Sequence, residues 1–305
     1  MASQVRAVRG RSWAERLAAS PAPWLAPLGL VLAITFLYPI VEIIRLSFTN
    51  ASLTGGNYSY TLGSYARLFG SPYFASMVRV TVIFVFFSVV FQILLGFLIA
   101  LAVDQGARRG MRASIVTRTA VLSAWAIPGV IIGIIWGILY QESGAGVLNY
   151  LAQLLGFGQI PFLSSPRAAL ASVTVANIWR GTAFSMILLY AGIQTLPADV
   201  LEAARVDGAN AWQRLTRVVV PLLAPILLVT LVIVSIDTFN TFDMVLALTG
   251  GGPGRATEVI ALSIYDQIFQ QFDLGPGAAT AVVLLAINAI MTFVYLRLER
   301  PEELS

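Results

Sequence analysis

Residues 80–103 read VTVIFVFFSVVFQILLGFLIALAV, and no charged side chain interrupts them. A helix of about 20 apolar residues is long enough to cross the ~30 Å hydrocarbon core of a bilayer. The run lacks the alternation of polar and apolar residues that a membrane-spanning β-strand requires. Because lipid offers no partners for backbone N–H and C=O groups, a helix is the structure that satisfies them. We therefore expect residues 80–103 to form a membrane-spanning helix.

Five further apolar runs have a similar length. One of them, residues 168–192, is interrupted by Arg180 alone, and the uncharged ones are residues 17–41, 119–141, 218–236 and 274–296. The chain of 305 residues is 58% hydrophobic and 11% charged, whereas soluble domains carry about 25% charged residues. We therefore expect an all-α, polytopic membrane protein with six transmembrane helices. It forms one domain over residues 1–305, with an N-terminal segment (1–24), a six-span core (25–298) and a tail (299–305).

The basic residues indicate the orientation of these spans. All 19 of them are arginines. Six spans place both termini on one side of the membrane, and 13 arginines then fall on that side. The opposite side holds Arg67, Arg79, Arg167 and Arg255. Since short arginine-rich loops stay in the cytoplasm, we expect cytoplasmic termini and a cytoplasmic loop between the fourth and fifth spans. The dispersal of the arginines argues against a nucleic-acid partner.

The chain contains no lysine, histidine or cysteine. A phosphate-binding loop of the Walker type needs a lysine, nucleophilic triads need a histidine, and most zinc sites need histidine or cysteine. We therefore expect no ATPase site, no enzymatic activity and no bound metal or cofactor. Asp237 and Asp243 would lie on roughly opposite faces of one helix, which does not favour a catalytic pair. As intramembrane carboxylates they leave one alternative open, a self-standing, ion-coupled secondary transporter.

The predicted cytoplasmic loop has a distinctive order of residues. Residues 202–221 read EAARVDGANAWQRLTRVVVP. Pro197 and Asp199 favour a helix start just before them, and Gly208 permits a reversal of the chain that other residues resist. The pattern predicts a short polar helix, a glycine elbow and a second helix that leads into Pro221 and the fifth span.

This loop resembles the EAA loop of the inner-membrane permease subunits of binding-protein-dependent ABC importers. Val218 and Val220 stand where that family has isoleucine and leucine. The resemblance implies a coupling helix that contacts a cytoplasmic ATPase through Glu202, Ala203, Ala204, Asp207, Gly208 and Pro221. It also implies a second related permease, two ATPase copies that hold ATP and magnesium, an extracytoplasmic sugar-binding protein, and a multi-pass location in a bacterial or archaeal plasma (inner) membrane.

A second resemblance narrows the family. Residues 239–243 (FNTFD) and 248–253 (LTGGGP) are similar to the fifth span and outer loop of carbohydrate importer permeases of the maltose and glycerol-phosphate types. This implies import of a sugar, such as a disaccharide or oligosaccharide, along a cavity lined by the fourth and fifth spans. The outer-loop residues are Gly250, Gly251, Gly252 and Pro253, and so many glycines suggest a flexible break.

Polar side chains within these two spans are the candidates for the substrate pathway, because such groups are costly in lipid and usually face a cavity. They are Asn177, Arg180, Gly181 and Phe184 in the fourth span, and Asp237, Thr238, Asn240, Thr241 and Asp243 in the fifth, where glycine and phenylalanine are neighbours of the polar groups. Carboxylates, amides and an arginine beside flat apolar faces suit a polyhydroxylated substrate. The alternative is a structural ion pair between Arg180 and Asp237 or Asp243.

Three local features have structural explanations. Glu42 and Arg45 are spaced for an i, i+3 ion pair at the end of the first span. Pro128 and Gly129 predict a kink in the third span. The apolar spacing within residues 259–272 suggests an interfacial helix, or a surface for the binding protein.

Overall fold

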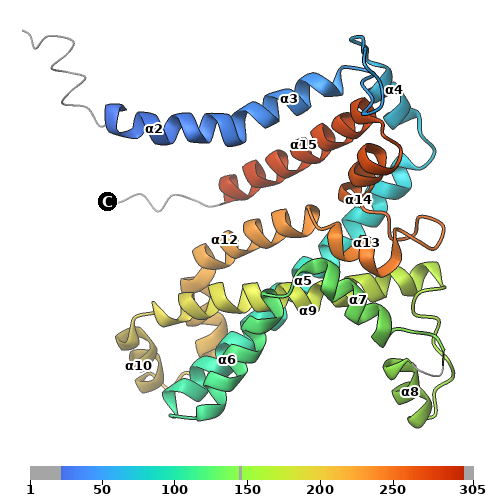
Figure 1. The fold of residues 1–305 in the computed structure, drawn as a ribbon. Helices are drawn as coiled ribbons and strands as arrows, with labels where there is room; N and C mark the ends of the chain where they lie inside the picture. The colour runs from blue at the N-terminus through green and yellow to red at the C-terminus, as the bar shows by residue number, and fades with distance from the viewer. Residues whose placement is uncertain (1–21, 144–145, 299–305) are drawn as a thin grey trace, which may run out of the picture.

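The computed structural model describes residues 22–143 and 146–298 (Figure 1). The regular secondary structure of these residues is helical. Their one β-type contact is an isolated antiparallel bridge between Thr49 and Tyr60. Four helices are long and apolar enough to cross a membrane by themselves, and two bent helix pairs raise this number to six if each pair counts as one span. The prediction of an all-α membrane protein is confirmed.

The first span continues beyond its predicted end. It consists of α2 (Ala22–Leu32), the π-helical turn η1 (Ala33–Leu37) and α3 (Tyr38–Ser47). The uncharged run ends at Val41, but the helix goes on because Glu42 and Arg45 neutralise each other one turn apart. The last span, α15 (Leu274–Leu298), packs beside α3 (Figure 1). The first part of the predicted run, residues 17–21, lies outside the described residues.

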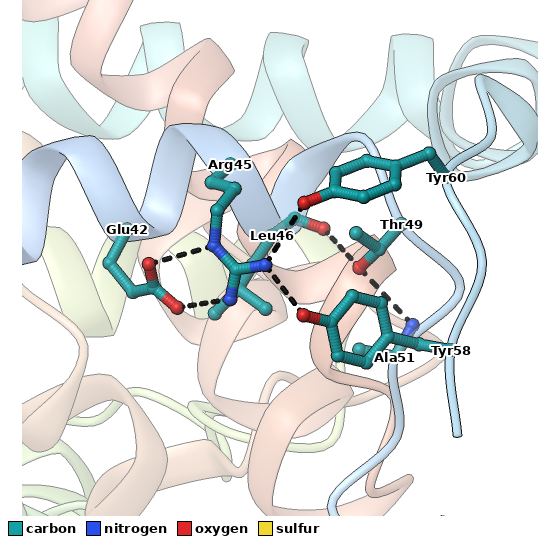
Figure 2. Close-up of polar contacts among 7 residues, drawn as sticks. All are labelled: Glu42, Arg45, Leu46, Thr49, Ala51, Tyr58 and Tyr60. Atoms are coloured by element: carbon teal, nitrogen blue, oxygen red, sulfur yellow. Dashed lines mark hydrogen bonds and ion pairs between the residues drawn. The ribbon is translucent and has the colours of Figure 1, made fainter.

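Figure 2 shows how this ion pair anchors the following loop. Arg45 Nε donates a hydrogen bond to Glu42 Oε2 at 2.8 Å. Arg45 Nη1 donates to the hydroxyl oxygens of Tyr58 at 2.6 Å and Tyr60 at 3.2 Å. Both tyrosines belong to the loop between α3 and α4 (Gly63–Gly70). The expected i, i+3 pair is therefore confirmed, and it fixes the loop to the end of the first span.

Two long helices pack against each other at the centre of the fold. They are α5 (Phe74–Arg108), which contains residues 80–103, and α9 (Pro166–Gln194), which contains the predicted fourth span. A Cβ atom added to Gly96 of α5 would lie 2.6 Å from the Cβ atom of Ser185 of α9. Any side chain at Gly96 would therefore push the two helices apart.

The third span is broken rather than kinked. Its residues form α6 (Arg112–Trp125) and α7 (Gly129–Leu139), whose axes differ by 103°. Pro128 takes an extended conformation with ψ 140°, and its ring and missing N–H end the helical hydrogen bonding. The expected position of the bend is confirmed, but its size exceeds that of a kink.

The fifth span begins in the polar loop and ends at a break that we did not predict. A bend of 75° separates α9 from α10 (Ala198–Val206). After it come α11 (Ala211–Arg214), the π-helical turn η2 (Leu215–Val219), α12 (Val220–Phe239) and α13 (Asp243–Thr249). α11 to α12 run as one helix, but α13 is separate. Asp237 and Asp243 therefore lie on different helices, and the assumption that one helix carries both was wrong.

The segment after the glycine-rich loop belongs to the core of the fold. α14 (Ile260–Tyr265) packs against α15, and Val259, Ile260 and Leu262 are at most 1% exposed. The π-helical turn η3 (Asp266–Gln270) follows it. The expected interfacial helix was wrong for Val259 and Ile260, whose apolar spacing reflects burial against protein, while Phe272 at the end of the predicted stretch is 46% exposed.

The helix ends gather at two opposite ends of the fold (Figure 1). The beginning of α2, the ends of α5, α9 and α15, and all of α10 lie at one end, which we call the α10 end. The elements α4, α8 (Val147–Leu154), α13 and α14 lie at the other, which we call the α14 end. This alternation matches the predicted up-and-down order of the spans. The arginines Arg67, Arg79, Arg167 and Arg255 belong to the α14 end.

Candidate functional site

The helix α10 presents a slim face at the α10 end. Glu202 and Ala203 are exposed, Ala204 is half-buried, and Val206 is 88% exposed. Asp207 follows as the exposed C-terminal cap of the helix. The predicted short helix therefore forms, and its exposed surface combines small side chains, acidic groups and the apolar side chains of Val200 and Val206.

Gly208 turns the chain between α10 and α11. Its φ is +76°, and no atom lies within 4 Å of an added Cβ atom. A side chain here would therefore have enough space, and only the left-handed backbone conformation disfavours it. Asn210 and Gln213 then form a reciprocal capping box with two hydrogen bonds of 2.9 Å. Pro221 lies after η2, whose wider turn accommodates a proline ring within a continuous helix. The helix, elbow and second helix are as predicted.

Four of the predicted pathway residues line one cavity of about 100 Å³ near the middle of the fold. Arg180, Gly181 and Phe184 come from α9, and Asp237 comes from α12. Trp125, at the end of α6, stacks on Phe184 with ring centroids 5.6 Å apart and an interplanar angle of 25°. The cavity thus places a guanidinium group and a carboxylate beside a pair of aromatic rings.

Gln92 of α5 also lines this cavity, and we did not predict it. Its side chain is 2% exposed, and Nε2 donates a hydrogen bond of 3.0 Å to the carbonyl of Asn177. A Cβ atom added to Gly181 would overlap the Gln92 side chain, so Gly181 makes room for it. The sequence could have indicated Gln92, since it is the one amide side chain in the apolar run 80–103. Nothing in the sequence indicated Trp125, because aromatic residues are common in spans.

Arg180 forms no ion pair among the described residues. The pairs within 4.0 Å there are Glu42–Arg45, Arg67–Asp273, Asp104–Arg108 and Arg255–Glu258. The alternative of a structural ion pair between Arg180 and Asp237 or Asp243 finds no support in this part of the chain. The arginine and the carboxylate are therefore available to a bound molecule.

Four other predicted residues lie outside the lining of this cavity. Asn177 and Thr238 are buried, and in the described structure Asn177 Nδ2 and Thr238 Oγ1 lack hydrogen-bond partners. Asn240 Nδ2 and Thr241 Oγ1 donate to carbonyls four residues earlier, at 2.7 and 3.0 Å. The structure places this second pair at the end of α12, where the side chains cap the helix.

Asp243 is the ninth predicted residue, and it lies at the break in the third span. It is the first residue of α13, where a carboxylate is favoured by the helix dipole. A Cβ atom added to Gly129, the first residue of α7, would overlap the Asp243 carboxylate. Asp243 therefore lies against the beginnings of two helices, α7 and α13, and Gly129 permits this approach.

The glycine-rich loop at the α14 end forms a hydrogen-bonded turn. Gly250 and Gly251 have φ values of +58° and +87°, which end α13 in the left-handed region. The Thr257 N–H donates to the Gly251 carbonyl at 3.1 Å, and Thr257 Oγ1 donates to the Gly252 carbonyl at 2.9 Å. Pro253 follows Gly252 through a cis peptide bond. In this turn the glycines supply a conformation that other residues resist, and the flexibility of the break stays a prediction.

Residues 92–301 match the family described as the binding-protein-dependent transport system inner membrane component. The trehalose/maltose transport system permease protein of Thermococcus litoralis is 35% identical over 240 residues, covering 78% of this chain and 79% of that protein. The sulfoquinovosyl glycerol transport system permease protein of Agrobacterium fabrum is 33% identical over 283 residues, covering 92% of this chain and 90% of that protein.

The fold is also found among solved structures. A chain of a bacterial alginate ABC transporter, in complex with an alginate pentasaccharide-bound periplasmic protein, has a TM-score of 0.80 at 21% identity and covers 95% of this chain and 98% of its own length. Likeness at this identity establishes the fold alone, whereas the family match and the relatives establish descent. The chain belongs to the family of binding-protein-dependent transport system inner membrane components, the permease subunits of ABC transporters.

Proposed function

We propose that this chain forms part of the translocation pathway of an ATP-driven, binding-protein-dependent importer of sugars. The observation that carries the proposal is the cavity where Arg180 and Asp237 lie beside the stacked rings of Trp125 and Phe184. Charged groups can bind sugar hydroxyls, and flat rings can pack on the apolar faces of a sugar. The relatives named for trehalose, maltose and sulfoquinovosyl glycerol support this substrate class. Family membership does not support an ion-coupled secondary transporter.

We propose that the sugar, a disaccharide or oligosaccharide, binds between two permease chains, because the cavity of this chain alone is small. Ligand pockets usually have volumes of about 300–1,000 Å³, whereas this cavity has about 100 Å³. One chain therefore supplies part of the site, and a second, related permease supplies the rest. An extracytoplasmic binding protein would deliver the sugar, as the alginate transporter's complex with a periplasmic protein suggests.

In this proposal α10 is the surface that a cytoplasmic ATPase contacts. Two ATPase copies bind ATP and magnesium, and their closure moves α10 and switches the cavity between the two sides. The uncovered side chain of Val206 and the exposed Glu202 support a protein contact here. The α10 end faces the cytoplasm, which agrees with the small number of arginines at the α14 end.

The test measures sugar uptake per assembled complex in lipid vesicles with the binding protein. Arg180→Ala, Asp237→Asn and Trp125→Ala each remove one proposed contact. Losing a hydrogen bond to a charged group costs about 1.5–3 kcal/mol, so Arg180→Ala and Asp237→Asn are expected to lower uptake at low sugar concentration about tenfold or more. Trp125→Ala removes a stacking ring and is expected to lower uptake as well. Val229→Ala is the control, because Val229 lies on α12 and is 47% exposed outside the cavity. Normal uptake in all three variants would place the pathway elsewhere.

A further inference from the structure

We infer that Asp104 is a positioning residue for coupling, which fixes the last turn of α9, and so the base of α10, to the end of α5. The inference rests on the proposed role of α10. Asp104 Oδ1 accepts a hydrogen bond from Gln194 Nε2 at 2.7 Å. Asp104 Oδ2 accepts one from Arg108 Nε at 2.8 Å. Both carboxylate oxygens are engaged, and the side chain is 13% exposed.

The position of Asp104 needs an explanation, because helix electrostatics oppose it. α5 ends at Arg108, so Asp104 lies near the negative end of the helix dipole. Arg108 offsets part of this cost from the same face of the same helix. The other partner, Gln194, is 90 residues away in the chain. The dipole of α5 disfavours an acidic residue at position 104. The bond from Gln194 of α9 to the Asp104 carboxylate explains why an acidic residue nevertheless lies there.

Gln194 is the last residue of α9, immediately before the 75° bend into α10. The bend itself is stabilised locally, since Thr195 Oγ1 donates to the Gly192 carbonyl at 2.8 Å. Asp104 therefore holds the point from which α10 departs. Among the described residues, its bond to Gln194 is the side-chain hydrogen bond that joins the end of α5 to the end of α9.

Packing alone does not fix α10 to α5. A cavity of about 450 Å³ lies between the end of α5 and the α10–α11 loop. Its apolar lining includes Leu101 of α5 and Leu201 of α10, and Asp104 and Arg108 line it as well. With open space between the helices, the direction of α10 depends on how its base is held. The Asp104–Gln194 bond supplies that restraint.

The same two helices carry residues of the proposed sugar site. Gln92 of α5 and Arg180 of α9 line the central cavity, and the Gln92 bond to the Asn177 carbonyl joins the helices there. The bond between Asp104 and Gln194 joins them again at the α10 end. A movement of α10 is then transmitted to both helices together. Without Asp104, α10 can change direction while α5 stays in place, because Ile193 still packs the last turn of α9 against α5.

The test uses the complete complex in lipid vesicles with its binding protein, and measures sugar uptake and ATP hydrolysis in one preparation. We expect Asp104→Ala and Gln194→Ala each to lower uptake per ATP about fivefold to tenfold, with normal amounts of assembled complex. The double variant is expected to be no worse than either single variant, because both remove one bond. Arg108→Gln is the matched control, since it removes the partner of Asp104 that lies on α5 itself, and coupling is expected to persist.

An exchange variant separates positioning from general structural damage. Gln194→Glu alone opposes two carboxylates and is expected to uncouple. Combining it with Asp104→Asn restores one donor and one acceptor at unchanged side-chain lengths, and coupling is expected to recover. No recovery, or additive losses in the two alanine variants, would overturn the inference. Normal coupling in both alanine variants would overturn it as well, while uncoupling by Glu202→Lys in the same assay would leave the proposed role of α10 intact.

Discussion

At the residue scale, two glycines decide which polar side chains reach the centre of the fold. Gly181 leaves room for the Gln92 side chain, and Gly129 leaves room for the Asp243 carboxylate. In both cases a polar group from one helix occupies the volume that a side chain on another helix would take. The composition of the site therefore depends on pairs of residues far apart in the chain, which inspection of a single span does not reveal.

Gly181→Ala is expected to destabilise the protein. The new methyl group would overlap the amide end of the buried Gln92 side chain, which would have to shift and give up its hydrogen bond to the Asn177 carbonyl. Overpacking of this kind costs about 1–3 kcal/mol. The measurement is the melting temperature of the purified protein in detergent. Gly137→Ala is the matched control on another span, because its methyl group would lie at an ordinary 3.7 Å from Leu248 Cδ1. Equal melting temperatures for the two variants would contradict the steric argument.

Glu142 is expected to make stability depend on pH. The pKa of its carboxyl group is lowered, first by the Leu163 N–H and then by the Ser164 hydroxyl and N–H, at 2.7–2.8 Å. Because the folded pKa is lowered, the stabilisation is present above the unfolded pKa, about 4.3, and is lost as pH falls through the folded pKa. Glu142→Gln should therefore melt below the unmodified protein at pH 7, and the gap should close below about pH 4. A gap that is independent of pH would rule this out.

At the element scale, the sequence predicted α10 and its elbow. It predicted the position of the break between α6 and α7, but it did not predict the break between α12 and α13. Pro128 indicates where the break between α6 and α7 lies, although the angle of the bend, 103°, depends on packing. The end of α12 at Phe239 has no proline or glycine nearby. There Asn240 and Thr241 bond back to the helix while Asp243 starts a new one. Such an end is decided by tertiary contacts that local propensity does not contain.

Gly208→Ala is expected to impair coupling at the element scale. A left-handed conformation costs a residue with a side chain about 1–2 kcal/mol, and Gly208 has φ +76° with open space around it. The elbow should therefore relax and α10 should change direction. Co-purification of the ATPase and substrate-stimulated ATP hydrolysis would be measured together. Gly158→Ala, at a position with open space and without a positive φ, is the control. Equal behaviour of the two variants would show that the elbow conformation does not matter.

At the scale of the whole molecule, the length of the apolar runs was sufficient to predict the four long spanning helices and the two bent helix pairs as membrane segments, because the bilayer sets that length. Because successive spans alternate in direction, the same runs predicted that the helix ends gather at two opposite ends of the fold (Figure 1). The apolar spacing of α14 could not distinguish a lipid surface from a protein surface, and Val259 and Ile260 are buried in the fold. An apolar face indicates that water is excluded from it, but it does not indicate whether lipid or protein covers it. The central cavity was predicted in part, since Arg180 and Asp237 are polar while Trp125 is not.

The orientation of the whole molecule can be tested with single cysteines, because the chain contains none. Ala107 is exposed in the last turn of α5, after the apolar run 80–103, at the α10 end, and Gln271 is exposed at the α14 end. With the arginine-poor α14 end outside the cell, an impermeant thiol reagent should label Gln271→Cys in intact cells and Ala107→Cys only after the membrane is opened. Both variants should take up sugar normally, which shows that labelling reports the native topology. Labelling of Ala107→Cys in intact cells would invert the molecule in the membrane, and α10 could then no longer meet a cytoplasmic ATPase.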